Sequence, residues 1–257
     1  MGEVTEIGWT DSTFNPWLGC QHVSEGCRNC YAESMMDRRY GRVKWGPHGD
    51  RVRTSAAYWR QPLTWNKHAA LFQAKHGHRQ RVFCASLADV FDNQVPNDWR
   101  IDLWATIART PDLDWLLLTK RPENISKMLP GSCVEQMVGR DLPWPWPNVW
   151  LGVTAEDQVA YDRRWPILRD IPAAVRFISY EPAIGPLRMP MVQLVSPDWI
   201  ICGGESGSGY RAMPELWADD IRQQCADFGI AFFFKQMAGK KPIPDRLMVR
   251  EFPECVI

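Results

Sequence analysis

The sequence predicts an α/β fold, namely a partial or full (β/α) barrel of the TIM type. Short apolar runs of strand length alternate along the chain with amphipathic segments of helix length. Continuous apolar runs of this kind are typical of strands buried on both faces of a parallel sheet. No glycine-rich phosphate-binding loop follows any of these runs, which disfavours the main alternative, a doubly wound nucleotide-binding sheet.

Six apolar runs are the predicted strands, and an additional first strand is expected near Ile7–Trp9 or within Thr13–Leu18. The six runs are Arg81–Ser86, Trp115–Thr119, Val149–Thr154, Val175–Tyr180, Trp199–Gly203 and Ala231–Phe234.

Helices are predicted between these runs from apolar spacing and end signals. Asp98 is a candidate cap for the helix that follows it, and Gly229 is a candidate C-terminal stop. Repeated strand–helix units imply right-handed crossovers, and six or seven of them favour a barrel. The expected helices are Tyr31–Arg39, Asp98–Arg109, Arg121–Leu129, Gln158–Trp165 (ended by Pro166) and Pro214–Phe228.

Composition predicts a single globular domain over residues 1–257 with a packed core, since 45% of the residues are hydrophobic and 23% are charged. The N-terminus lacks the basic region and apolar run of a signal peptide. The sequence has no apolar stretch of about 18 residues, the length that a membrane span needs. We therefore expect a cytoplasmic protein with no membrane partner.

Residues 42–80 interrupt the strand–helix rhythm and form a predicted basic, Trp-rich insertion. The stretch from Arg38 to Arg81 holds eleven Lys or Arg residues and one acidic residue, Asp50, a net charge of +10 in a chain of net charge +0. Cations neutralise phosphates and aromatic rings stack on bases, so a nucleic acid or a nucleotide is the expected substrate. A solvated loop whose Trp residues pack against the barrel is the alternative. The interleaved aromatic residues are Tyr40, Trp45, Tyr58, Trp59 and Trp65.

Three of the eight cysteines cluster in the segment FNPWLGCQHVSEGCRNCYAE, at Cys20, Cys27 and Cys30. Gly19 and Gly26 allow the tight backbone that a loop needs to bring three thiolates to one metal centre. A helix predicted to begin near Cys30 points its N-terminus at that centre, which favours an anionic cluster.

An iron–sulfur cluster explains why the number of clustered cysteines is three. A [4Fe–4S] cluster needs four ligands, so three thiolates leave one iron open to a small molecule. A Cys3His zinc site that includes His22, or a redox pair of Cys27 and Cys30, are the alternatives.

The motifs FNPWLGC, CYAE, LLTKRPE, LGVTAED, SYEP, GGESG and FFFKQ resemble those of the phage-associated three-Cys-motif family, which has no assigned chemistry. The resemblance runs from about Trp9 to Gln236. That family is in turn similar to radical S-adenosylmethionine (SAM) proteins in its cysteine loop and expected barrel. The resemblance implies a barrel of radical SAM type, with a [4Fe–4S] cluster and SAM as cofactors and a flavodoxin or ferredoxin as electron donor.

Polar residues follow the predicted strands, and in a barrel they would face the cysteine loop at one edge. Carboxylates suit the SAM ammonium group and ribose hydroxyls, and a cation such as Lys120 or Arg121 suits its carboxylate. The candidate cofactor-binding residues are Tyr31, Ser86, Asp89, Lys120, Thr154, Glu156 and Ser179, and the candidate catalytic residues are Glu181, Glu205 and Lys235.

The sequence therefore predicts a radical SAM-type enzyme that modifies or repairs a nucleic acid or nucleotide. Two alternatives remain open: a zinc-stabilised nucleic-acid-binding module, and an iron–sulfur redox protein that does not use SAM.

Overall fold

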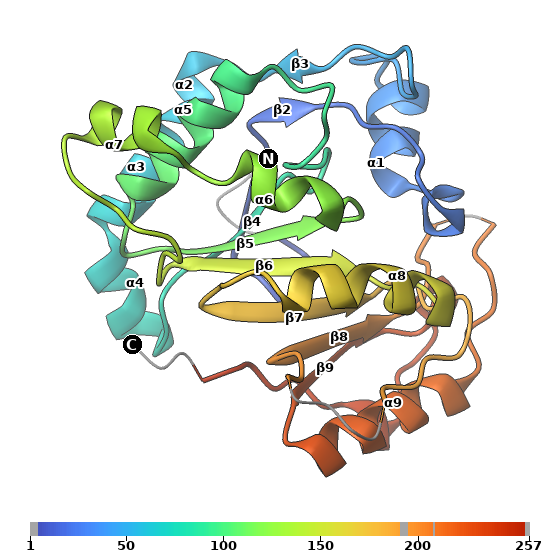
Figure 1. Cartoon of the computed structure of the whole chain (residues 1–257). Coiled ribbons are helices and arrows are strands. Elements are labelled where there is room, and N and C mark those ends of the chain that lie inside the picture. Colours follow the sequence, from blue (N-terminus) through green and yellow to red (C-terminus); the bar gives the residue numbers. More distant parts are fainter. Residues whose placement is uncertain (1–4, 191–194, 208, 255–257) are drawn as a thin grey trace.

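Seven parallel strands form one curled sheet in a computed structural model that describes residues 5–190, 195–207 and 209–254 (Figure 1). Their spatial order, β1-β4-β5-β6-β7-β8-β9, follows the chain without a reversal. A doubly wound sheet requires a reversal of strand order, so that alternative is wrong. The strands are β1 Ser12–Phe14, β4 Arg81–Cys84, β5 Asp114–Thr119, β6 Val149–Thr154, β7 Val175–Tyr180, β8 Trp199–Gly203 and β9 Ala231–Gln236.

The predicted α/β fold with a partial barrel is confirmed, because β1 and β9 remain the two edges of the described sheet. The first strand lies at Ser12–Phe14, which overlaps the second of the two positions expected for it, Thr13–Leu18. No helix in the described ranges is long and apolar enough to cross a membrane.

The helices match the predicted segments, with two corrections. Asp98 was expected to cap its helix, but α5 begins at Asn97 after Pro96, so Asp98 lies within the first turn. Pro166 was expected to end its helix, but α8 continues through it to Arg169. The proline removes one backbone donor, and Trp165 and Leu168, buried on either side of it, hold the helix on the sheet. The elements are α1 Tyr31–Glu33 continuing as a π-helix over Ser34–Arg39, α5 Asn97–Ala108, η3 Pro122–Asn124, α6 Ile125–Met128, α7 Ser132–Val138, α8 Gln158–Arg169 and α9 Glu215–Phe228.

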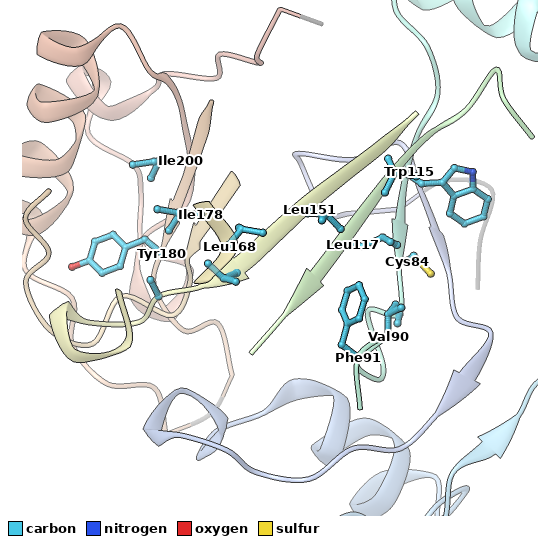
Figure 2. Close-up of a cluster of buried hydrophobic side chains, with 14 of the residues drawn as sticks. Cys84, Val90, Phe91, Trp115, Leu117, Leu151, Leu168, Ile178, Tyr180 and Ile200 are labelled. Atoms are coloured by element: carbon cyan, nitrogen blue, oxygen red, sulfur yellow. The ribbon is translucent and has the colours of Figure 1, made fainter. Parts of the chain in front are cut away.

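In the part of the chain that the structure describes, helices α5, α8 and α9 pack on the outer face of the sheet, where the larger hydrophobic core lies. Strand residues such as Leu151, Ile178 and Ile200 point outward and pack with Leu168 of α8 (Figure 2). Because side chains alternate along a strand, their neighbours in sequence point to the inner face.

The inner face carries a second, largely aromatic core below the carboxyl ends of the strands. It contains Trp150, Phe177 and Trp199, which lie at most 1% exposed, together with Trp9 from the segment before β1. Trp9 packs 4.6 Å from the Phe83 ring, measured between centroids. This core fills the half-barrel behind the carboxyl ends of the strands and leaves the carboxyl end itself for polar residues.

The basic insertion contains the strand β3 Val52–Arg53 and the helices α2 Ala56–Trp59, α3 Gln61–Lys67 and α4 Ala69–His76. Strand β3 pairs antiparallel with β2 Trp17–Leu18, which precedes the cysteine loop. Trp59 and Trp65 are buried in the outer core. The expectation that these two rings offer stacking surfaces to bases is therefore wrong, since burial of a large apolar ring in the core is more favourable than its exposure.

Candidate functional site

The cysteine loop, residues 19–30, lies at the carboxyl edge of the sheet, where α1 also begins (Figure 1). The loop follows the β1–β2 segment and is tied to the next strand connection by a hydrogen bond from the Gly19 N–H to the Leu87 carbonyl, 3.3 Å long. Side chains that follow four of the strands hold the loop in place. This agrees with the prediction that polar residues after the strands face the cysteine loop.

Arg121, after β5, holds the first part of the loop. Its Nη1 lies 3.5 Å from Cys20 Sγ and its Nη2 donates to the Gln21 carbonyl at 3.2 Å. Asp89, after β4, fixes the same guanidinium at 2.8 Å and also accepts from the Thr119 hydroxyl. Burial and the Asp89 charge raise the pKa of Cys20 to about 11 against the opposing effect of Arg121, so the metal-free side chain is a thiol.

Glu156, after β6, supports the middle of the loop. Gly26 packs against the carboxyl group of Glu156, since a β-carbon added at Gly26 would be 3.0 Å from Glu156 Cδ. Arg164 of α8 pairs with the carboxylate at 2.6 Å, and both side chains are at most 4% exposed. Burial raises the pKa of Glu156, but the charges of Arg164 and Lys120 together with hydrogen bonds to the carboxylate outweigh burial, and the net shift of the pKa is downward.

Glu205, after β8, holds the end of the loop. It accepts a hydrogen bond from Asn29 Nδ2 at 2.9 Å and pairs with Arg211. Arg211 also donates to the Glu25 carbonyl at 3.0 Å. Burial opposes ionisation of Glu205, but its hydrogen bonds with Arg211 lower its pKa overall.

Tyr31, directly after the last cysteine, donates from its hydroxyl to the Ser86 carbonyl at 2.5 Å. Cys27 and Cys30 lie in one turn, because the Cys30 N–H donates to the Cys27 carbonyl at 3.2 Å. Burial raises the pKa of Cys30, and the charge of Lys120 opposes that shift. Lys120 also lowers the pKa of Glu156, so its charge acts on both groups.

The donor chemistry of the loop fits an iron–sulfur cluster, since all three cysteines are free and thiolates are the usual ligands of such clusters. The three thiols do not converge on one point, since in the described part of the chain no three His, Cys, Asp or Glu side chains are placed to hold one metal ion. His22 pairs instead with Glu33, at 2.6 Å. Cluster binding therefore requires the three cysteine side chains to move closer together, which couples it to the conformation of the loop.

A row of polar side chains faces inward at the carboxyl end of the half-barrel. Thr154 and Ser179 are register partners on β6 and β7, each 1% exposed, and neither hydroxyl has a hydrogen-bond partner among the described residues. Glu181, after β7, pairs with Lys235 of β9 at 2.7 Å and accepts from Trp9 Nε1 at 3.3 Å. Two hydroxyls that face the inner space beside an ion pair are suited to binding a small polar molecule.

The structure thus brings the predicted strand-end residues to one edge, but divides their roles. Asp89, Glu156 and Glu205 hold the cysteine loop, whereas Lys120, Thr154, Ser179, Glu181 and Lys235 face the inner space. The sequence interpretation missed the partners Asn29, Arg164 and Arg211. The sequence signal for two of these partners was a cation soon after each carboxylate. Arg164 comes eight residues after Glu156, and Arg211 comes six residues after Glu205.

Acid is expected to release the middle of the loop through Glu156. The pKa of this carboxyl is lowered in the folded protein, so its stabilising contribution is complete above the unfolded-state value of about 4.3 and is lost as pH falls through the folded-state pKa. Urea unfolding of wild type and Glu156→Gln should differ most at about pH 7 and converge toward about pH 3. Glu123→Gln, at an exposed site, should show no such convergence; equal pH profiles for the two variants would contradict the assignment.

The family comparison matches residues 4–249 to the family described as "Protein of unknown function (DUF5131)". The chain belongs to this family. Searches of curated proteins and of solved structures gave no match. The description of the DUF5131 family names neither a phage association nor an activity, so the resemblance to radical SAM proteins stays a prediction and the functional argument rests on the residues.

Proposed function

We propose that this chain is a radical SAM-type enzyme in which Cys20, Cys27 and Cys30 bind a [4Fe–4S] cluster, and that it acts on a nucleic acid or a nucleotide. When bound, such a cluster supplies the electron for reductive cleavage of SAM and so the radical chemistry that removes hydrogen from a substrate. A flavodoxin or ferredoxin is the expected electron donor.

The observation that carries the proposal is the position of the cysteine loop. It lies at the carboxyl edge of an all-parallel half-barrel, where barrel enzymes place their active sites. Three strand-end side chains, Arg121, Glu156 and Glu205, hold it through contacts of their own. A loop with only a stabilising role would not need three separate supports from buried charged groups, each of which is costly to desolvate.

The inward polar row gives the chain the means to bind SAM. Lys120 has no ion-pair partner among the described residues and lies near Cys30, so it can hold a carboxylate. The hydroxyls of Thr154 and Ser179 can donate to or accept from a ribose. Glu181 can orient an ammonium group or a substrate, with Lys235 and Trp9 fixing its position. The aromatic core beneath excludes water from that side.

Removal of any one of the three cysteines is expected to abolish iron retention. Cys20→Ala, Cys27→Ala and Cys30→Ala each leave too few thiolates to hold the cluster. Iron and acid-labile sulfide are measured after anaerobic purification and reconstitution. Cys133→Ala, at an exposed cysteine, and Cys84→Ala, at a buried cysteine of β4, should retain wild-type iron. The other cysteine suited to this control, Cys255, lies outside the described residues.

Two results would reject the proposal. Equal iron content in all five variants would remove the ligand assignment, and stoichiometric zinc without iron in anaerobic protein would favour a zinc-stabilised module. If iron is retained but dithionite-reduced protein forms no 5′-deoxyadenosine from SAM and does not bind SAM, the chain is an iron–sulfur protein without SAM chemistry.

A further inference from the structure

We propose that a basic patch beside the cysteine loop binds the sugar–phosphate backbone of a single-stranded nucleic acid. The patch consists of Arg38, Arg39, Tyr40, Arg42 and Lys44, at the end of the helix that begins at α1 and in the turn after it. This inference deepens the proposed function by fixing the substrate class as a polynucleotide. Its binding test can be read whether or not the protein holds iron.

The cations of the patch are free to meet phosphates. Arg39 and Arg42 are exposed and have no acidic partner among the described residues. Arg38 pairs with Glu33 at 3.1 Å, but its side chain is 65% exposed. Lys44 lies 3.7 Å from an Asp37 oxygen and is 83% exposed. Exposed pairs of this kind contribute little, so phosphates can compete for both cations.

Tyr40 gives the patch a site for a base. Its ring is 51% exposed, and the guanidinium carbons of Arg39 and Arg42 lie 5.4 Å and 5.5 Å from the ring centroid. An exposed ring with two arginines close to it can stack on an unpaired base while the arginines neutralise the adjoining phosphates. Bases in a duplex are already stacked on each other, which favours a single strand.

The patch is attached directly to the cysteine loop. The Trp45 N–H donates to Asp37 Oδ2 at 2.7 Å, and the next residue, Gly46, donates to the Cys20 carbonyl at 2.9 Å. Met36 and Val43 are buried in a small core that also contains Leu18 and Leu87 and contacts Cys30. A strand bound on the patch is therefore held at a fixed position relative to the cysteines.

A shallow hollow of about 260 Å³ lies between the patch and the cysteine loop. Its wall includes His22, two residues after Cys20, and the half-buried ring of Trp45. Gln21 and His22 of the cysteine loop and Trp45, the residue after the patch, share this wall, so the hollow adjoins both segments.

Five further cations of the basic stretch do not join this patch. Arg51, Arg53 and Arg79 pair with Asp92, Asp102 and Asp114 at 2.6 to 2.8 Å. Helices α3 and α4, which carry the exposed Lys67 and Lys75, lie toward the opposite end of the sheet from α1 (Figure 1). These two lysines therefore provide a control with the same loss of charge.

The test measures fluorescence anisotropy of a labelled single-stranded oligonucleotide of about 20 nucleotides, as DNA and as RNA, between about 50 and 200 mM KCl. Arg39→Ala/Arg42→Ala should weaken binding about tenfold or more and lower the slope of log K against log salt by about 1.4, which is about 0.7 for each lost phosphate contact. Lys67→Ala/Lys75→Ala should change binding less than about twofold. Tyr40→Ala should weaken it about fivefold or more, and Tyr40→Phe should retain it.

An equal loss in the two double variants would overturn the inference, as would a wild-type protein that binds no oligonucleotide at about 50 mM KCl. Binding to phosphatidylserine vesicles in place of the oligonucleotide, lost in Arg39→Ala/Arg42→Ala, would also overturn it. Iron content separates the two proposals. Wild type with iron but no oligonucleotide binding rejects this inference alone, and patch-dependent binding by a protein that cannot hold iron rejects only the enzymatic proposal.

Discussion

Replacement of Arg121 by methionine is expected to lower the free energy of unfolding by about 3 kcal/mol, the lower end of the range for breaking a buried ion pair. Arg121 and Asp89 are each 4% exposed, so the variant leaves a carboxylate in the interior without its cation. The loss is at the lower end because Asp89 still accepts hydrogen bonds from the Thr119 hydroxyl and from the Phe91 and Lys120 N–H groups. Urea unfolding followed by circular dichroism measures the effect.

Two further variants test the cause of that loss. Arg169→Met removes an arginine whose pair with Asp170 is exposed, and it should cost less than about 1 kcal/mol. Asp89→Asn in the Arg121→Met background removes the unpaired charge and should recover part of the stability. If Asp89→Asn makes the single variant still less stable, the uncompensated charge is not the reason for the loss.

The strands were predictable because each is buried on both faces and therefore reads as an apolar run. Four of the strands, for example Val149–Thr154, agree closely at both ends with the predicted ranges. Whether the barrel closes was not predictable, because closure depends on whether β1 and β9 pair. Trp9, which precedes the first strand, instead packs among the inner-face residues of the sheet.

The common location of the strand-end residues was predictable, since carboxyl ends of parallel strands share one edge. Their partners were not, because Arg164 and Arg211 come from the helix and loop after each strand, and their placement depends on packing angles that sequence spacing does not fix. The basic insertion was misread for a related reason. Polar neighbours suggested exposed rings, but Trp59 and Trp65 lie on the buried faces of short helices.

Substitution of Gly152 by alanine is expected to lower the free energy of unfolding by about 3 kcal/mol, the upper end for overpacking in a core. Gly152 is the register partner of Phe177, and a β-carbon added there would lie 2.3 Å from Cζ of that ring. The ring is fully buried and lies in the inner core that supports Ser179 and Glu181 from below. Alanine at residue 152 must therefore displace the ring or the strand that carries the inward polar row. Urea unfolding measures the loss.

A double-mutant cycle separates this clash from a general cost of replacing glycine. Phe177→Leu shortens the side chain, so Gly152→Ala should cost at least about 1 kcal/mol less in the Phe177→Leu background than in wild type. Gly131→Ala is the matched control, because Gly131 has no neighbour within 4 Å, and it should change stability by less than about 0.5 kcal/mol. Strict additivity in the cycle would mean that the ring does not occupy the space above Gly152. The inner aromatic core would then be arranged differently, and the polar row above it would lose the rigid base that the binding of a small cofactor requires.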